Sequence, residues 1–378
     1  MGDISESYSG GTPTAGKKEY YDGDIPFIRS GEISGDKTEL FITDEGLNNS
    51  SAKMVKIGDI LYALYGATSG EVSISKLKGA INQAILAIHP HEDYDSQFLM
   101  QWLRKNKENI IGTYLQGGQG NLSGNIVKQL LIDVPTYEEQ KKIGAYFEHL
   151  DNLITLHQRK CEETRKLKKY MLQKMFPQNE KKFPEIRFQA FTEDWEQRKF
   201  GEITIKYEDS VPTPHDGYYR LGIRSHAKGT FHSYVAKGQE LETAQMQRVA
   251  AGNFIVNITF GWEHAVAITD ESDAGKLVSH RFPQFSFIEG MIPEFFRYVI
   301  IDERFRHHLW LASPGGAGRN RVLKLDEMLN YLMKFPSRDE QIKIAEFFRQ
   351  LDNLITLHQQ KYEELQKIKK FMLQNMFV

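Results

Sequence analysis

Apolar residues recur at three-four spacing along two long segments of the chain, residues 138–177 and 339–378. Each segment follows a proline and consists mainly of good helix formers, so each is predicted to be one helix about 55 to 60 Å long. A stripe of that length is typical of a coiled-coil-like pair, although a helix inside a globular core is the simpler alternative. The residues expected on the seam of the pair are Phe147, Leu150, Ile154, His157, Cys161, Met171, Phe348, Leu351, Ile355, His358, Tyr362 and Met372.

The two helical segments are copies of one another. The string LDNLITLHQ occurs at residues 150–158 and again at residues 351–359. At a constant offset of 201, residues 138–176 match residues 339–377 at 25 of 39 positions without a gap. Such self-similarity indicates an internal tandem duplication. An antiparallel pair is predicted, because it would put the two domains that precede the helices at opposite ends.

The remainder of the chain consists of two domains that share a skeleton but little sequence. Domain 1 is residues 1–137, domain 2 is residues 201–338, and residues 178–200 are a linker. Short alternating apolar runs bounded by glycine predict strands and turns, with helices interspersed. The predicted fold class is therefore α+β: two mixed α/β domains alternating with two long helices that pair as an antiparallel coiled-coil-like scaffold.

Both domains end in the same order of elements. A helical stretch, residues 96–109 in domain 1 and 292–311 in domain 2, is followed by a glycine-rich loop and then by a short apolar strand that ends in proline. The helices stayed nearly identical while the domains came to differ. This pattern is expected of two copies that fit the same partner but read different targets.

Composition is that of a globular protein, with 40% hydrophobic and 26% charged residues. The chain has no apolar run long enough to cross a bilayer and no signal peptide, so a cytoplasmic protein without a membrane partner is expected. The single cysteine, Cys161, excludes an internal disulfide and a thiolate zinc cluster. The net charge of −2 says little about nucleic-acid binding, which depends on where charge lies.

Motifs of the common DNA-modifying enzymes are missing from the sequence. No Asn-Pro-Pro-aromatic or Asp-Pro-Pro-aromatic string is present, and no glycine loop continues into Gly-Lys-Ser or Gly-Lys-Thr as in a P-loop. The glycine-rich loops lack the acidic residue expected of a dinucleotide site. The histidines of the second domain, His264, His280, His307 and His308, do not have zinc-site spacing. Neither catalytic nor metal-ligating residues are therefore expected.

The alternation of variable domain and near-identical helix resembles the specificity subunits of Type I restriction-modification enzymes over essentially the whole chain. Individual strings agree with that resemblance: SGGTP at residues 9–13 with YDGDIP at 21–26, Glu139-Gln140 leading into the helix, and the linker FPEIRF at 183–188 before Trp195. One departure is that domain 1 begins at Gly2 without a counterpart of this linker. Its start is either naturally short or lacks a segment, which leaves the packing of that edge open.

The resemblance implies that each domain reads one half of a bipartite, asymmetric site in double-stranded DNA while the helices fix the spacing. It also implies docking of two methyltransferase subunits that use S-adenosylmethionine, and assembly with restriction subunits that need ATP and magnesium. No cofactor and no catalytic activity would belong to this chain. Two alternatives remain: a coiled-coil adaptor with two protein-binding domains, and a self-sufficient DNA methyltransferase or nuclease.

Residues that read DNA are expected on turns and loops, where side chains reach base edges and phosphates. Arginine and lysine suit guanine, asparagine and glutamine suit adenine, and aromatic rings line the groove or stack. For each residue a solvated surface position or a structural turn is the alternative. The candidates in domain 1 are Lys17, Lys18, Arg29, Ser30, Tyr62, Tyr65, Gln116, Gln119 and Asn121. The candidates in domain 2 are Arg220, Arg224, His226, Lys228, Phe260, Trp262, Arg319, Asn320 and Arg321, the last three beside a glycine-rich loop.

Overall fold

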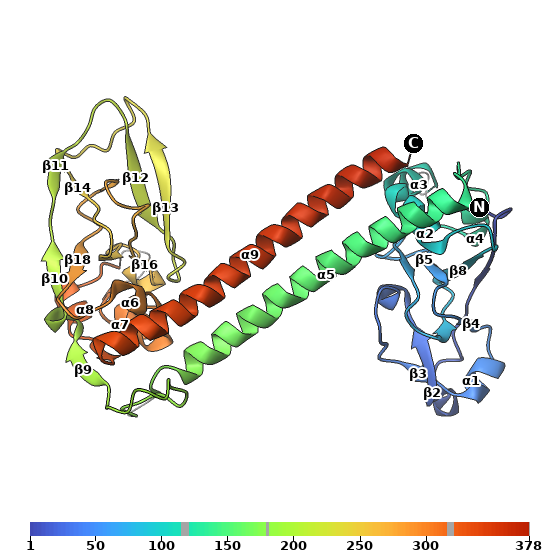
Figure 1. Cartoon of the computed structure of the whole chain (residues 1–378), viewed down its shortest axis with the longest axis horizontal. Helices are drawn as coiled ribbons and strands as arrows, with labels where there is room; N and C mark the ends of the chain where they lie inside the picture. The colour runs from blue at the N-terminus through green and yellow to red at the C-terminus, as the bar shows by residue number, and fades with distance from the viewer. Residues whose placement is uncertain (115–120, 179–180, 316–320, 378) are drawn as a thin grey trace. The chain divides into compact units, whose positions relative to one another are not determined.

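The computed structural model describes residues 1–378 except 115–120, 179–180, 316–320 and 378. The chain forms two compact units, of which unit 1 is Met1–Lys160 with His358–Val378 and unit 2 is Cys161–Leu357. Each unit contains one α/β domain and parts of two long helices, α5 (Tyr137–Lys174) and α9 (Arg338–Met376), which Figure 1 shows in green and red. No helix among the described residues is long and apolar enough to cross a membrane.

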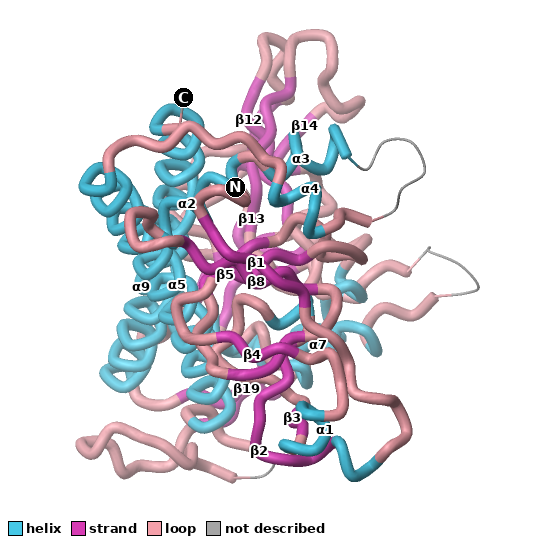
Figure 2. Tube along the Cα trace, turned by 90° about the vertical axis from the view of Figure 1, so that its right-hand side faces the viewer, coloured by secondary structure: helices cyan, strands magenta, loops and turns pink. Residues whose placement is uncertain are grey.

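Domain 1 is built on two four-stranded sheets. The first is antiparallel, and Figure 2 shows three of its strands side by side; its order is β1 (Ser5–Ser9), β8 (Ile85–Pro90), β5 (Ile60–Ala63), β6 (Val72–Ile74). The second has the order β3 (Phe41–Ile42), β2 (Tyr21–Ile28), β7 (Gly79–Ile81), β4 (Lys53–Val55), and β2 and β7 are parallel. The short helices are α1 (Asp44–Asn48), α2 (Ser96–Lys105), α3 (Lys107–Tyr114), α4 (Gly124–Lys128) and the 3-10 turns η1 (Lys18–Tyr20) and η2 (Ser30–Glu32).

Domain 2 has sheets of four, five and two strands. The four-stranded sheet has the order β10 (Thr204–Tyr207), β18 (Gln284–Phe287), β15 (Phe254–Val256), β16 (Val266–Ile268). The five-stranded sheet has the order β11 (Ser210–Pro212), β14 (Gln245–Arg248), β17 (Leu277–Val278), β12 (Tyr218–Ile223), β13 (Thr230–Val235), and β19 (Leu332–Phe335) pairs with β9 (Glu196–Lys199). The helices are α6 (Pro293–Val299), α7 (Glu303–Leu311), α8 (Leu325–Leu329) and the 3-10 turns η3 (Phe200–Glu202) and η4 (Gly261–Glu263).

The duplication visible in the helices extends through the domain topology. The order β1-β8-β5-β6 of domain 1 has its counterpart in the order β10-β18-β15-β16 of domain 2. The second sheets agree as well, since β12 pairs in parallel with β17 as β2 does with β7. Among the described residues, domain 2 differs by the additional strand β11 at one edge and by the two-stranded sheet of β19 and β9. Two copies of one fold therefore carry different sequences, and the predicted α+β class is confirmed.

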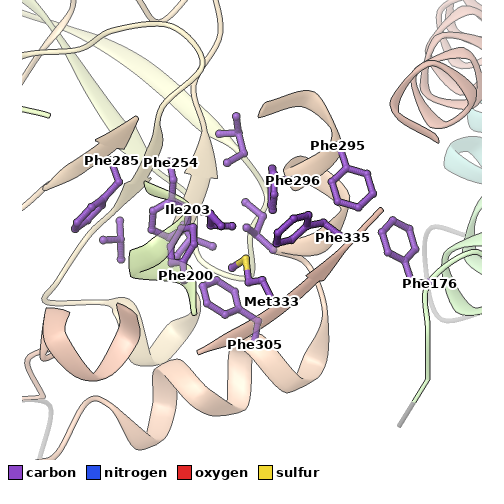
Figure 3. Packing of buried hydrophobic residues seen from close by; sticks show 14 of the residues in the cluster. Phe176, Phe200, Ile203, Phe254, Phe285, Phe295, Phe296, Phe305, Met333 and Phe335 are labelled. Carbon is purple, nitrogen blue, oxygen red and sulfur yellow. The ribbon is translucent and has the colours of Figure 1, made fainter. Parts of the chain in front are cut away.

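Each domain core is closed by a phenylalanine that follows a long helix in the sequence. In unit 1 the ring of Phe377 lies 5.2 Å from that of Phe98 and 5.7 Å from that of Phe147. In unit 2 the ring of Phe176 lies 5.7 Å from that of Phe295 and 5.9 Å from that of Phe348. Figure 3 shows Phe176 at one edge of the cluster of buried hydrophobic side chains that forms the core of domain 2. The end of each helix copy is thus anchored by burial of a large apolar side chain.

Within each unit the two long helices run antiparallel. In unit 1 Asp151 of α5 forms an ion pair with Lys369 of α9, and His157 contacts His358. In unit 2 Lys168 Nζ lies 2.5 Å from Asp352 Oδ1. The residue number rises along one helix as it falls along the other, as the predicted antiparallel pairing requires.

One local prediction is confirmed with an interruption, and another was wrong. The helical stretches 96–109 and 292–311 are each two helices, interrupted near Asn106 and Asp302. Asp302 begins the second helix as its N-cap, because its side chain accepts a hydrogen bond from the backbone N–H of Arg304. The apolar run 131–134 is not a strand, although its counterpart β19 is. In domain 2, β19 pairs with β9. In domain 1, the carbonyl oxygen of Leu130, just before this run, instead accepts a hydrogen bond from the amino group of Met1.

Candidate nucleic-acid interface

The turn between β12 and β13 is held by backbone hydrogen bonds to the segment around η4. The backbone N–H of His226 donates to the carbonyl of Glu263 at 2.9 Å, and that of Ala227 donates to the carbonyl of His264 at 2.8 Å. His226 and Ala227 both have positive φ angles, 62° and 49°, which L-residues adopt at a cost in free energy. The turn therefore places the exposed His226 beside η4, which contains Trp262.

Arg224 and Arg220, two arginines predicted to contact DNA in this part of domain 2, differ in their exposure. Arg224 is exposed, donates to the carbonyl of Thr230 and lies 5.3 Å from the centre of the Phe231 ring. Arg220 lies within β12 and is half-buried. Lys228 is exposed in the turn itself. Arg224, His226 and Lys228 therefore form a basic turn, the segment of domain 2 best placed to meet a phosphate.

A shallow hollow of about 350 Å³ lies next to this turn and is lined by Trp262, Arg306, His307 and Trp310, the set called here the tryptophan hollow. The ring of His307 is nearly parallel to that of Trp310, at 12° and 6.0 Å between centres. The guanidinium of Arg321 lies 4.8 Å from the centre of the Trp310 ring. Phe260, just before η4, is 47% exposed. Aromatic faces and positive charge thus meet at one place on the surface of domain 2.

The side chain of Arg29 in domain 1, by contrast, is bound to neighbouring carboxylates. Its guanidinium contacts Glu32 at 2.7 Å and Glu39 at 3.0 Å. The hydrogen bond from Arg29 lowers the pKa of Glu32 to about 2. The same pair closes η2, which contains Ser30. These contacts favour the structural alternative for Arg29.

The other candidates of domain 1 differ in their surroundings. Lys17 and Lys18 are exposed, and Lys17 Nζ lies 3.0 Å from the hydroxyl of Tyr20. Tyr65 forms an isolated bridge with the exposed Asn121. Tyr62 is fully buried in the core of unit 1, where burial raises its pKa to about 12, so it offers no surface to a ligand and is removed from the candidates. The predicted residues Gln116, Gln119, Arg319 and Asn320 lie outside the described residues.

The four histidines of domain 2 that were considered as zinc ligands have separate environments. His264 is buried, its Nε2 lies 2.7 Å from the carbonyl oxygen of Ile300, and burial lowers its pKa. His280 and His307 are exposed, and His308 Nε2 lies 2.7 Å from the carbonyl oxygen of Glu327. Among the described residues no three His, Cys, Asp or Glu side chains gather as a metal site would require.

The residues predicted for the helix seam are buried or half-buried. Phe147, Leu150, Cys161, Phe348 and Leu351 are buried, while Ile154, His157, Met171, Ile355, His358, Tyr362 and Met372 are half-buried. Phe147 and Phe348 also belong to the domain cores rather than to the helix pair alone. The apolar stripe of each long helix consequently packs partly against the other helix and partly against a domain core.

Comparison with known proteins identifies the family. The sequence pattern of the Type I restriction modification DNA specificity domain matches residues 1–165 and again residues 226–367. The chain belongs to this family. It carries two specificity domains in tandem, each joined to one copy of the long helix.

Individual relatives agree with this assignment. The chain is 24% identical over 388 residues to the MjaVIII Type I restriction enzyme specificity subunit of Methanocaldococcus jannaschii, covering 98% of this chain and 89% of the relative. It is 28% identical over 235 residues to the MjaIX specificity subunit of the same organism, covering 57% and 53%. The crystal structure of a Type I restriction-modification S subunit from M. genitalium superposes with a TM-score of 0.62 at 15% identity, covering 100% of this chain and 94% of the other. This last likeness shows a shared fold.

Sequence reasoning missed part of the tryptophan hollow in the second specificity domain. Arg306 and Trp310 were not predicted to contact DNA, and His307 was considered only as a zinc ligand. All three lie on α7, where buried Phe305 and Leu309 mark the opposite, core-facing side. Large aromatic and basic residues on the polar side of a short amphipathic helix are a pattern that would have pointed to them.

Proposed function

We propose that this chain is the DNA-reading subunit of a Type I restriction-modification enzyme, with each specificity domain contacting one half of a bipartite, asymmetric site. The observation that carries the proposal is the repetition of one domain topology with different surface residues on two nearly identical helices. Two identical readers would serve a palindromic site. Two divergent readers on a duplicated scaffold suit a site whose halves differ.

Contacts to the second half-site would come from the basic turn and the tryptophan hollow. Cationic side chains on phosphates set the register of a protein on DNA, and side chains that reach base edges supply discrimination. For this role we retain Arg220, Arg224, His226, Lys228, Phe260, Trp262, Arg319, Asn320 and Arg321. In domain 1 we retain Lys17, Lys18, Ser30, Tyr65, Gln116, Gln119 and Asn121 for the first half-site, with Arg29 as a support for η2.

The long helices would act as a spacer and as the docking surface for other subunits. Helices of 38 and 39 residues are each about 57 Å long at 1.5 Å per residue. Two methyltransferase subunits would supply S-adenosylmethionine-dependent adenine methylation, and restriction subunits would supply ATP- and magnesium-dependent cleavage. The chain itself would contribute recognition and no catalytic step.

Mapping of adenine methylation across the genome of cells that express this chain with its partner methyltransferase tests the proposal. The expected result is one bipartite motif with two different halves and a fixed gap. Methylation by the isolated chain would instead establish a self-sufficient methyltransferase. A chain that is not retained on DNA, or whose retention is insensitive to salt, would favour the protein-binding adaptor, because phosphate contacts make binding strongly salt-dependent.

The spacer role predicts that longer helices lengthen the gap between half-sites. Seven residues inserted after Lys160 and seven inserted after Leu357 keep the heptad phase and leave the contacts within each compact unit in place. The added length of about 10 Å corresponds to about three base pairs of B-DNA. Methylation mapping should show both half-sites unchanged and the gap longer. The same seven residues inserted after Gly238, in an exposed turn, should leave the gap as it was, and an unaltered gap in the helix variant would contradict the spacer role.

A further inference from the structure

The tryptophan hollow has the surface chemistry of a nucleotide site. Trp310 is 45% exposed although it is a large aromatic residue, and the half-buried Trp262 forms another part of the lining. The indole Nε1–H of Trp262 already donates to the carbonyl of Thr259 at 3.2 Å. What Trp262 offers to a ligand is therefore ring surface rather than a hydrogen bond. Exposed ring surface of this kind stacks on any base, because every nucleobase has a π-face.

Positive charge surrounds these rings. Arg306 lines the hollow, and its ion pair with Glu303 is solvent-exposed, so the pair is weak enough to be exchanged for a phosphate. Arg321 covers one face of Trp310, and His307 lies beside the same ring. A methylated lysine or another cationic ligand is disfavoured by these arginines, although aromatic rings alone would attract one. Rings flanked by guanidinium groups suit a base joined to an anionic backbone.

We propose that the tryptophan hollow takes the ring face of one nucleobase of the second half-site, displaced from the duplex stack, while Arg306 and Arg321 bind the flanking phosphates. The inference rests on the proposed function and names one contact within it. A base still inside the stack presents only its edges to a protein, so occupancy of this hollow requires local unstacking. Specificity at that position would then come partly from how readily the base step unstacks.

The two specificity domains differ at this place. The helix of domain 1 that corresponds to α7 in the order of elements is α3, with the sequence KENIIGTY, and it contains no tryptophan. Its only aromatic residue, Tyr114, packs against the core of unit 1. The proposed base contact therefore belongs to the second half-site alone, in keeping with an asymmetric site.

A double-mutant cycle between protein and DNA tests the proposal. The full chain in complex with its partner methyltransferase is titrated with a duplex carrying the mapped site, and with duplexes in which each nucleotide of the second half-site in turn is abasic. Trp310→Ala is compared with Trp310→Phe, which keeps a ring, and with Leu311→Ala, which removes another exposed apolar side chain from the adjacent position of α7. Circular dichroism and thermal melting verify that the variants fold.

Trp310→Ala is expected to weaken binding of the intact duplex about 5- to 150-fold, the range of one base-aromatic stack. At one abasic position it should cost nothing further, because the stacked base is already missing; Trp310→Phe should retain most of the affinity and Leu311→Ala all of it. An equal loss on every abasic duplex together with a reduced salt dependence would mean a phosphate contact only, and would overturn the proposal. Unchanged affinity for Trp310→Ala would overturn it too, and would be the result if the hollow holds a peptide. Failure of the unaltered complex to select the mapped duplex would instead count against the proposed function.

Discussion

At the scale of single residues, the duplicated helices are joined by charges that correspond through the offset of 201. Asp151 pairs with Lys369, and Lys168 pairs with Asp352, so each pair is the copy of the other. Asp151 also accepts hydrogen bonds from Gln101 at 3.1 Å and Arg104 at 3.0 Å. Burial alone would raise the pKa of Asp151, but the cationic partners outweigh it and lower that pKa. The carboxylate of Asp151 therefore joins both long helices to domain 1.

Replacement of Asp151 by Asn should lower the free energy of unfolding by about 1–3 kcal/mol, because Lys369, only 13% exposed, loses its counter-charge. The matched variant Asp352→Asn should lower it by less than about 1 kcal/mol, because Asp352 is 42% exposed and its partner is more accessible. Denaturant unfolding followed by circular dichroism measures both. Equal losses for the two variants would show that the difference in burial between the pairs has no energetic consequence.

At the scale of secondary-structure elements, His157 and His358 are the equivalent residues of the two helix copies and meet across the seam. Their Nδ1 atoms lie 3.0 Å apart, a distance at which only one of the two nitrogens can carry the hydrogen. Burial, the neighbouring His358, Lys160 and Lys361 all lower the pKa of His157. The folded helix pair thus favours the neutral form of the His157 imidazole.

Stability of the helix pair should consequently fall in acid. A lowered pKa in the folded state means that the unfolded chain binds the proton more readily, so the contribution of His157 is complete above about pH 6.5 and is lost as the pH falls below it. His264, whose pKa is also lowered, acts in the same direction. The melting temperature should therefore drop between pH 8 and pH 5 in the unaltered chain and drop less in His157→Gln, with the difference isolating the seam. Parallel pH profiles for the two proteins would rule out a role for His157.

The elements differ in how far sequence alone could predict them. Three-four periodicity identified both long helices and the stripe that includes Phe147 and His358, because a helix face repeats within a few residues. The break at Asn106 and the missing strand at residues 131–134 were not predicted, since a cap and a strand partner depend on tertiary context. Tyr62 was wrongly taken for a surface residue because a four-residue strand buried on both faces shows no alternation.

The same limit of prediction from sequence applies to the tryptophan hollow. Trp262 and Trp310 are 48 positions apart in the sequence, and η4 and α7 bring them to one surface. Trp262 was predicted from its residue type and its turn. Trp310 was not, because nothing within its own helix reveals what faces it. The sequence predicted a suitable residue within one element, whereas it did not predict that η4 and α7 lie side by side.

At the scale of the whole chain, the ring contacts and ion pairs that involve both helix copies correspond to one another. Phe147 with Phe377 in unit 1 corresponds to Phe348 with Phe176 in unit 2, and the two ion pairs correspond likewise. His157 and His358 are counterparts of one another. Each helix copy therefore contains both members of every one of these pairs. Its surface is self-complementary, as in a two-fold symmetric interface.

A chain cut after Lys181, with one specificity domain and one long helix, should accordingly form a symmetric dimer. Phe176 of a second copy would take the place of Phe377 against Phe147, Lys168 would take that of Lys369 beside Asp151, and His157 would meet its own counterpart. Without that second copy Phe147 and Leu150 would be exposed to water, at a cost of about 1.5–3 kcal/mol for each large apolar side chain. Sedimentation should give twice the sequence mass, and Leu150→Glu should reduce it to the monomer. With the partner methyltransferase, this dimer should methylate a palindromic site made of two inverted first half-sites. A folded monomer would mean that the sequence differences between the two helix copies, rather than their shared residues, determine the pairing.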